Sequence, residues 1–239
     1  KQRNEMGVSV AIVGPSGGGK TTSHMINMDG TVDLNPEKYT GMNPKTHFII
    51  NTDCKQLPLP PHLWNRKNKN YTETKELEDI RKVFQYVAKN PDIKSISLDT
   101  LNVYLAYKEY NDRKKLTFDQ WRDVANDILE IIDMCNNVLR EDQIGYIFCH
   151  TNIQTDVDGA DKRVIAVLGK KSVSRPPEAF FPIVLMTTVE DDGDGEPRFF
   201  FETKMNRSTA KTPLGMFNEF RIPNSLALVD KAIRDYHKI

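Results

Sequence analysis

The chain has 239 residues, of which 38% are hydrophobic and 28% charged, so it is long and apolar enough to bury one sizeable core. Basic and acidic residues number 33 each, which excludes a global basic field and leaves only local patches for contact with nucleic acid. No apolar run approaches the length of a membrane span and no signal peptide opens the chain, so we expect no membrane partner. The three cysteines lack C-x-x-C spacing, which favours buried thiols in a reducing cytoplasm over disulfides or zinc.

The most informative motif lies near the start, where residues 14–21 read Gly-Pro-Ser-Gly-Gly-Gly-Lys-Thr and match the P-loop pattern G-x-x-x-x-G-K-[ST]. The apolar run 8–13 precedes it, and the segment 21–28, which contains no breaker, follows it. We therefore expect a strand, a phosphate-binding loop and a helix in that order. The glycines let backbone N–H groups point at phosphate oxygens, and the helix N-terminus adds partial positive charge.

The side chains of this loop predict the cofactors ATP and Mg²⁺. Lys20 is expected to reach the β- and γ-phosphates, and the Thr21 hydroxyl is expected to hold the metal ion. The alternative is a flexible glycine turn before a helix, which the flanking segments argue against. The predicted nucleotide-binding residues are Gly14, Pro15, Ser16, Gly17, Gly18, Gly19, Lys20, Thr21 and Thr22.

Short apolar runs separated by longer stretches predict an α/β fold. The predicted strands are residues 8–13, 47–51, 94–98, 145–149, 183–189 and 198–203. Because the first four alternate with long helical or irregular segments, we expect a mostly parallel sheet with helices on both faces and right-handed crossovers.

Three segments repeat apolar residues every three or four positions, which is the periodicity of an amphipathic helix. Asn90 and Pro91 end the first of these segments, and Thr117 and Gln120 have the spacing of a capping box at the start of the second. Each stripe is too short for a coiled coil, so we expect packing against the sheet. The stripes are Leu77, Ile80, Phe84 and Val87, then Phe118, Trp121, Ala125, Ile128, Ile132, Cys135 and Leu139, and finally Leu226, Val229, Ile233 and Tyr236.

Two segments interrupt the pattern. Residues 53–70 are rich in proline and carry a basic cluster, so we expect a long surface loop. Residues 189–198 place acidic residues between two apolar runs, which predicts a β-hairpin with a solvated tip rather than an EF-hand metal site. We expect a single domain over 1–239, with the hairpin and a last helix in 182–239.

The predicted Walker B acid is Asp99. A P-loop enzyme needs a carboxylate at the end of a neighbouring strand to hold magnesium through water. Asp99 directly follows the apolar run 94–98. The alternative is an N-cap, since Asp99 and Thr100 precede Leu101, and the two roles are compatible.

Polar residues after the second and fourth runs are further candidates for the site. Asp53 follows the second run, and strand ends on one side of a parallel sheet converge on the ligand. Asp53 is therefore the candidate base for the attacking water, while capping of the turn into the proline-rich loop is an equal alternative. His150 or Thr151 is a candidate to sense the γ-phosphate, and the alternative for His150 is a solvated loop residue.

This order of motifs resembles the RecA-like ATPases. A closer resemblance is to phage-encoded nucleotide-binding proteins that include RecA-like single-strand annealing recombinases, and residues 51–60, 96–101 and 199–217 carry it. RecA has Asn-Gln after the fourth strand, where this chain has His150 and Thr151. It also has a glutamate where this chain has Asp53.

The resemblance implies a RecA-like ATPase that acts on single-stranded DNA in phage recombination or annealing, in the cytoplasm of a bacterial host. It also implies a single-strand DNA-binding protein as a partner. RecA-like folds often complete the ATP site between subunits, which implies a homo-oligomeric ring or filament. Lys204 or Arg207 would then act on the γ-phosphate of a neighbour, and a solvated basic loop is the alternative for both.

Contact with single-stranded DNA needs cations along the backbone and aromatic rings for stacking. Two regions combine both features, and an ordinary basic surface loop is the alternative for each. Core packing is an equal alternative for Phe180 and Phe181. The regions are Lys170, Lys171 and Arg175 beside Phe180 and Phe181, and Arg66, Lys67 and Lys69 near Trp64 and Tyr71.

Two other functions fit the same motifs. A hexameric helicase or loader-type motor shares the fold but usually carries an extra domain, for which this chain has little room. A nucleotide-gated binding switch without processive hydrolysis stays open because Asp53 is an uncertain base. A small-molecule kinase is disfavoured because no compact segment resembles an arginine-rich lid.

Overall fold

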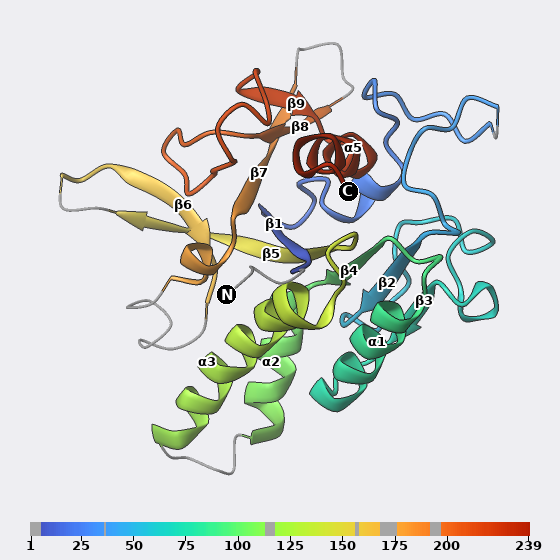
Figure 1. Cartoon of the computed structure of the whole chain (residues 1–239). Helices are drawn as coiled ribbons and strands as arrows, with labels where there is room; N and C mark the ends of the chain where they lie inside the picture. Colours follow the sequence, from blue (N-terminus) through green and yellow to red (C-terminus); the bar gives the residue numbers. More distant parts are fainter. Residues whose placement is uncertain (1–5, 36, 113–117, 156–157, 168–175, 192–196) are drawn as a thin grey trace.

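The computed structural model describes residues 6–35, 37–112, 118–155, 158–167, 176–191 and 197–239. They form a mixed sheet in the order β3-β2-β4-β5-β1-β7-β8-β9, with β6 paired to β5 outside this path (Figure 1). The predicted α/β class and mostly parallel sheet are confirmed. Among the described residues, no helix is both long and apolar enough to cross a membrane.

Parallel strands form the centre of the sheet, and each predicted strand region contains a strand. The parallel strands are β3 (Tyr71–Glu73), β2 (His47–Asn51), β4 (Ser95–Asp99), β5 (Ile144–Thr155), β1 (Val8–Gly14) and β7 (Ile183–Glu190). The antiparallel strands are β6 (Asp161–Ile165), β8 (Arg198–Glu202) and β9 (Arg221–Pro223). The predicted β7–β8 hairpin is confirmed, while its acidic tip, 192–196, lies outside the described residues.

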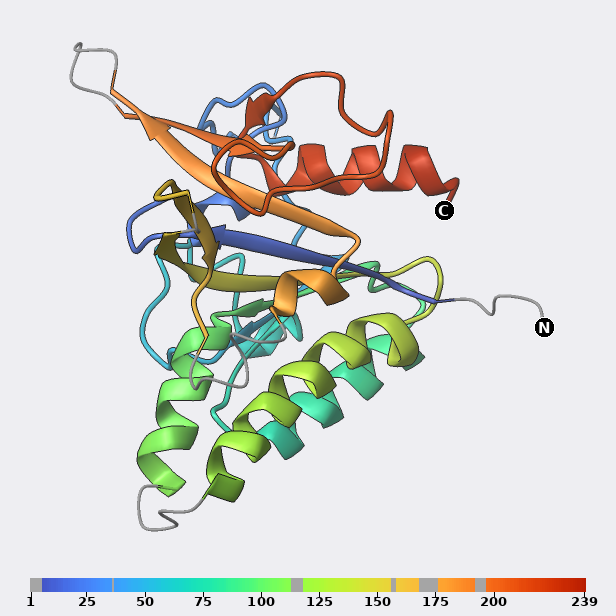
Figure 2. The same ribbon diagram turned by 90° about the vertical axis from the view of Figure 1, so that its left-hand side faces the viewer.

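Helices cover both faces of the sheet, as predicted (Figure 2). Three helices lie on one face and α5 lies on the other. The helices are α1 (Leu77–Lys89), α2 (Leu101–Asp112), α3 (Phe118–Asp133) and α5 (Leu226–His237). The predicted helix over 118–139 changes at its end to a π-helix, η3 (Met134–Val138), and the proposed cap at Thr117 lies outside the described residues.

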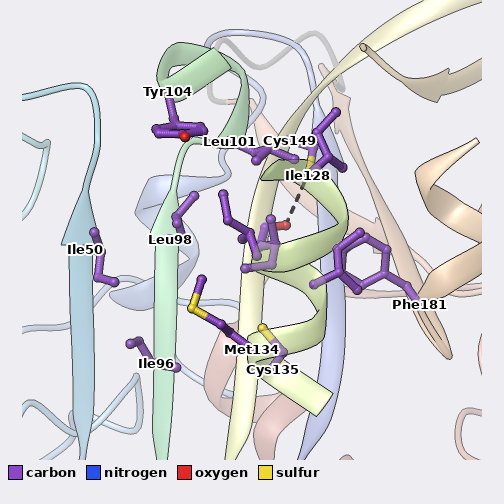
Figure 3. Packing of buried hydrophobic residues seen from close by; sticks show 14 of the residues in the cluster. Ile50, Ile96, Leu98, Leu101, Tyr104, Ile128, Met134, Cys135, Cys149 and Phe181 are labelled. Carbon is purple, nitrogen blue, oxygen red and sulfur yellow. Dashed lines mark hydrogen bonds between the residues drawn. The ribbon is translucent and has the colours of Figure 1, made fainter. Parts of the chain in front are cut away.

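Side-chain alternation along the strands creates two cores. Ile96 and Leu98 of β4 face the core beneath α2 and α3, together with Ile50 of β2 and Cys149 of β5 (Figure 3). The core on the opposite face of the sheet contains α5 and the strand residues that alternate with those of the first core, since neighbouring residues of a strand point to opposite faces. Cys135 and Cys149 are buried, as expected, whereas Cys54 is exposed.

The segment after the P-loop departs from prediction. It forms only a short 3-10 helix, η1 (Thr21–His24), instead of a helix over 21–28. The Thr22 and Ser23 hydroxyls donate to the carbonyls of Gly19 and Lys20, at 3.1 and 2.5 Å. The Ser23 N–H is shared between the same two carbonyls, and the Met25 N–H donates to the Thr22 carbonyl in the i to i+3 pattern of a 3-10 helix. The expected contribution of a helix N-terminus is therefore wrong.

Residues 53–70 also differ from the expected surface loop. Leu57, Leu59 and Trp64 are buried in the core that also holds α5. A short 3-10 helix, η2 (Arg66–Asn68), carries the exposed basic residues. Proline content predicted the irregular backbone but not the packing, because burial depends on the distant residues that the loop covers.

Replacing Phe84 with alanine tests the core beneath α1. Phe84 is fully buried, so Phe84→Ala should lower the free energy of unfolding by about 3–4 kcal/mol, through lost burial and a residual cavity. Gln85→Ala, at an exposed position of the same helix, is the matched control and should change it by less than about 0.5 kcal/mol. Urea unfolding followed by circular dichroism measures both; equal effects of the two variants would contradict this packing.

Candidate functional site

A cavity of about 770 Å³ lies at the carboxyl edge of the parallel strands. Gly14 at the end of β1 is paired in register with His150 of β5, and Asn51 of β2 is paired with Asp99 of β4. These pairings bring distant strand ends to one edge of the sheet, as predicted. The polar lining comprises Ser16, Gly17, Gly19, Lys20, Thr21, Thr22, Asp53, Lys55, Gln56, Asp99, Thr100 and His150.

The P-loop backbone requires glycine at two positions that line the cavity. Gly17 and Gly19 have φ angles of 76° and 83°, which L side chains rarely adopt. A Cβ on Gly19 would also lie 2.6 Å from Cδ1 of Phe199. Within the described residues, the backbone N–H groups of Gly19, Lys20 and Thr21 donate no hydrogen bond to a carbonyl of a turn, loop or cap. The loop therefore presents free donors to an anion, without an α-helix behind it.

Lys20 is held at the floor of the cavity. Its ammonium donates to the carbonyls of Gly14 and Pro15, each at 2.8 Å, and only 6% of the residue is exposed. Burial lowers the Lys20 pKa, while the Asp99 carboxylate opposes that shift. An anion that entered the cavity would meet a cation already fixed by the loop that surrounds it. The Gly18 N–H donates to the Pro15 carbonyl at 3.1 Å and closes the turn.

Asp99 and Thr21 meet, as the Walker A and Walker B prediction requires. The Thr21 hydroxyl donates to Oδ2 of Asp99 at 2.5 Å. The contact spans β5, which lies between β4, where Asp99 ends the strand, and β1, which leads into the P-loop. Burial raises the Asp99 pKa to about 6, and the Thr21 hydrogen bond and Lys20 partly counter it. A hydroxyl and a carboxylate are oxygen ligands of the kind that Mg²⁺ takes, so the donors fit this ion. Among the described residues, no cluster of three or more His, Cys, Asp or Glu side chains could hold a metal ion.

Asp53 lies across the cavity and has two partners. Thr100 Oγ1 donates to Asp53 Oδ1 at 3.2 Å, and Lys55 Nζ lies 2.8 Å from Asp53 Oδ2. Thr52 fixes the same corner, because its hydroxyl donates to the Thr100 carbonyl at 2.6 Å. Asp53 is thus brought into the site as predicted, while Lys55 was not predicted. The only signal for Lys55 was a cation two residues beyond a strand-end acid, a spacing too common to be informative.

His150 lines the cavity, but it does not end its strand. β5 continues to Thr155 and pairs with β6, so the predicted strand end at 149 is wrong. Burial and the nearby Lys20 lower the His150 pKa. Thr151 is paired with Ile165 and is not part of the cavity lining. The alternation of β5 therefore places only one of the two alternative γ-phosphate sensors, His150, at the cavity.

The proposed trans-acting cations do not reach this cavity. Lys204 is exposed and donates to the Asn218 carbonyl at 3.0 Å, and Arg207 is exposed with a φ of 47°. Neither residue lines the cavity. Within one chain, the lysines at the site are Lys20 and Lys55.

Of the two predicted DNA-contacting regions, the structure describes one in full and the other only in part. Residues 168–175, with the cations Lys170, Lys171 and Arg175, lie outside the described residues. Phe181 is buried and Phe180 is partly exposed, at 42%. Trp64 is buried and cannot stack on a base, while Lys67 and Lys69 beside it are exposed.

A buried polar chain supports the P-loop from below. His24 Nδ1 lies 2.7 Å from the Thr21 carbonyl oxygen, and His24 Nε2 lies 3.0 Å from Ser97 Oγ. The same Ser97 Oγ lies 3.0 Å from His47 Nε2. His47 Nδ1 in turn lies 2.7 Å from Ser95 Oγ. The carbonyl only accepts, so His24 Nδ1 carries a proton and its neutral Nε2 accepts from Ser97. His47 must then donate to Ser97 and accept from Ser95. Burial lowers the pKa of His24 to about 4, and that of His47 well below its ordinary range, so both rings stay neutral.

This buried hydrogen-bonded chain of histidine and serine side chains was not predicted from the sequence, because its residues belong to no motif. Ser95 and Ser97 share the face of β4 with Asp99, since alternate residues of a strand point the same way. Trp64 packs on the rings of His24 and His47, with centroids 6.0 and 5.8 Å apart. The loop after Asp53 therefore lies on the same polar chain that contacts Thr21.

The other wall of the cavity is apolar. It is formed by residues after the short helix η1, by the proline-rich loop, by one residue of α2 and by one aromatic residue of β8. Such a wall suits a flat ring, while the polar floor suits its charged groups. The apolar lining comprises Met25, Ile26, Val32, Leu34, Leu57, Pro58, Leu59, Pro60, Val103 and Phe199.

No model of a known protein family and no curated protein matches the chain. The fold and the geometry of the cavity are therefore the grounds on which its function is inferred.

Substitution of Asp99 by asparagine tests the buried carboxylate through stability. The ordinary carboxyl pKa of 3.8 is raised to about 6 in the fold, so the buried charge is destabilising at pH 7 and is neutralised as the pH falls through 6. Asp99→Asn should therefore raise the free energy of unfolding at pH 7 by about 2–3 kcal/mol, and this gain should vanish near pH 4. Urea unfolding in the presence of a chelator at pH 7, 5.5 and 4 measures this.

The matched control for this substitution is Asp92→Asn, at an exposed aspartate ahead of the same strand. It should leave the free energy of unfolding nearly unchanged at each pH. A gain for Asp99→Asn that persists at pH 4 would contradict the electrostatic origin of the effect.

Proposed function

We propose that this protein is a Mg²⁺-dependent ATPase whose site is the cavity at the carboxyl edge of the sheet. The observation that carries the proposal is the contact of Thr21 with Asp99, residues 78 positions apart, beside a complete P-loop. A phosphate-bound magnesium needs a hydroxyl ligand next to a carboxylate that can hold its waters. A glycine turn without this function would not require a buried carboxylate beneath it.

Each part of the nucleotide has a counterpart in the cavity. The free N–H groups of the loop and the fixed Lys20 ammonium suit the phosphates, and the apolar wall suits the base. Thr21 would hold Mg²⁺ directly, and Asp99 would hold it through water. The bound metal ion supplies neutralisation of the charge that develops on the phosphate oxygens.

Asp53 is the proposed base for hydrolysis. Its carboxylate takes a proton from water while the water oxygen attacks the terminal phosphorus. The bond from that phosphorus to the bridging oxygen breaks, and ADP keeps the electron pair. The supporting observation is that Thr100 orients Asp53 and that Asp53, Asp99 and Lys20 share one cavity.

Single-stranded DNA is the proposed macromolecular partner, in a RecA-like role in recombination or annealing. This part rests on the resemblance of the motifs. It is supported by the central place of β1 among parallel strands, by the β7–β8 hairpin and by the exposed Lys67 and Lys69. A ring or filament would bring Lys204 or Arg207 of one subunit to the site of the next, and a single-strand DNA-binding protein is a further proposed partner.

The second candidate function is a nucleotide-gated switch without processive hydrolysis. The ion pair between Lys55 and Asp53 favours it, because the ammonium occupies a carboxylate oxygen that would otherwise accept a proton from water. The two functions differ in turnover, which the experiments below measure.

Loss of the Lys20 side chain tests the nucleotide site. Lys20→Ala removes the cation fixed at the floor of the cavity and should abolish measurable ATP binding, a loss of affinity of at least about 100-fold. Lys45→Ala, at an exposed lysine just before β2, should bind ATP normally. Isothermal titration with Mg²⁺ and a non-hydrolysable ATP analogue measures both, and normal affinity in the Lys20 variant would refute the assignment.

The rate of ATP hydrolysis with and without single-stranded DNA separates the candidate functions. A DNA-dependent ATPase should be stimulated by single-stranded DNA, and its DNA binding should weaken steeply with salt because phosphate contacts release counterions. Phosphate release and fluorescence anisotropy at two salt concentrations measure these properties. Nucleotide binding without turnover would favour the switch, and failure to bind DNA at low salt would remove the recombination role.

A further inference from the structure

We propose that Lys55 is an ATP-sensing cation that exchanges the Asp53 carboxylate for the terminal phosphate of ATP within the same chain. This inference rests on the proposed ATP site and deepens it. It assigns the sensing of the γ-phosphate to a residue that the sequence did not single out, whereas the sequence-based candidates were His150 or Thr151 of the same subunit and Lys204 or Arg207 of a neighbour.

The geometry of the ion pair makes one partner fixed and the other free to move. The Asp53 side chain is 10% exposed and is anchored by the Thr100 hydroxyl. The Lys55 side chain is 69% exposed, although its ammonium lies 2.8 Å from Asp53 Oδ2 and its residue lines the cavity. Long exposed side chains retain rotamer freedom, so Lys55 can leave this contact at little cost.

The two lysines of the cavity occupy different places along the phosphate chain. Lys20 is bound to carbonyls of the P-loop and is expected to lie between the β-phosphate, which ATP and ADP share, and the near side of the γ-phosphate. Lys55 follows β2, which is three strand spacings from β1, about 14 Å across the sheet. A phosphate chain that leaves the P-loop towards Asp99 therefore points its outermost group at Lys55. ADP lacks that group, so only ATP can compete with Asp53 for this cation.

The exchange couples binding to activation. While Lys55 is paired with Asp53, its ammonium occupies one carboxylate oxygen and Thr100 donates to the other, so neither oxygen is open to a water molecule. A terminal phosphate carries more negative charge than a carboxylate and attracts the ammonium more strongly. When Lys55 moves to the phosphate, it neutralises the repulsion between that group and Asp53 and leaves the carboxylate free to accept a proton from water.

A purely structural ion pair makes a different prediction. If the pair only stabilised the loop after β2, removing either partner would perturb the site in the same direction. If Lys55 exchanges partners, the two removals act in opposite directions. Lys55→Ala removes a phosphate ligand, whereas Asp53→Asn releases that ligand and removes a repelling charge.

The test is a titration of the variants Lys55→Ala, Lys55→Arg, Asp53→Asn and the double variant with a non-hydrolysable ATP analogue and with ADP, in the presence of Mg²⁺. Lys55→Ala should bind the analogue about tenfold more weakly and ADP within about twofold of the wild type. Asp53→Asn should bind the analogue about threefold more tightly, and the double variant should lose that gain. Lys55→Arg should preserve most of the preference for the analogue over ADP.

Lys45→Ala is the control for a lysine outside the cavity, and thermal melting of each variant reports its folding. An unchanged preference in Lys55→Ala, or weaker analogue binding in Asp53→Asn, would overturn the exchange and leave the ATP site intact. Failure of the wild-type protein to bind either nucleotide would overturn both proposals.

Discussion

The hydrogen bond between Thr21 and Asp99 is the contact on which the cavity depends. It joins the P-loop to β4 across the intervening strand β5, so it forms only when the parallel sheet is correctly ordered. The Asp99 carboxylate is buried, and burial alone destabilises a charge. An uncharged residue would pack there at lower cost, whereas the proposed function needs a carboxylate at this position to hold Mg²⁺ through water.

A second layer of polar groups keeps this contact in place. The ordered chain from Ser95 through His47, Ser97 and His24 ends on the Thr21 carbonyl, the backbone of the same residue whose hydroxyl meets Asp99. Every hydroxyl and ring nitrogen in it has a partner, so the neutral rings are tolerated in the core. One of its bonds also bears on the short helix η1: His24 Nδ1 bonds the Thr21 carbonyl, to which the Met25 N–H would donate in an α-helix, and that N–H donates to the Thr22 carbonyl instead.

Much of the fold was predictable because its signals are local. Gly17 and Gly19 indicate a loop with left-handed backbone, and the apolar stripe through Ile80 and Phe84 predicts a helix. The short strands β3 and β9 were not predicted, because each has three residues, too few to show an alternating pattern. The extension of β5 to Thr155 was not predicted either, since apart from the exposed Ile153 its residues are polar and no apolar run marks them; they pair with β6.

The sequence by itself determined the phosphate-binding loop, the alternating strands and helices, and the acids Asp53 and Asp99, because motif spacing and hydrophobic periodicity are properties of neighbouring residues. Only the tertiary structure decided which strand ends meet, that Lys55 pairs with Asp53, and that the proline-rich loop lines the cavity. It also excluded Lys204 and Arg207 from the cavity of their own chain. These outcomes depend on strand order and burial, which contacts between residues far apart in the chain determine.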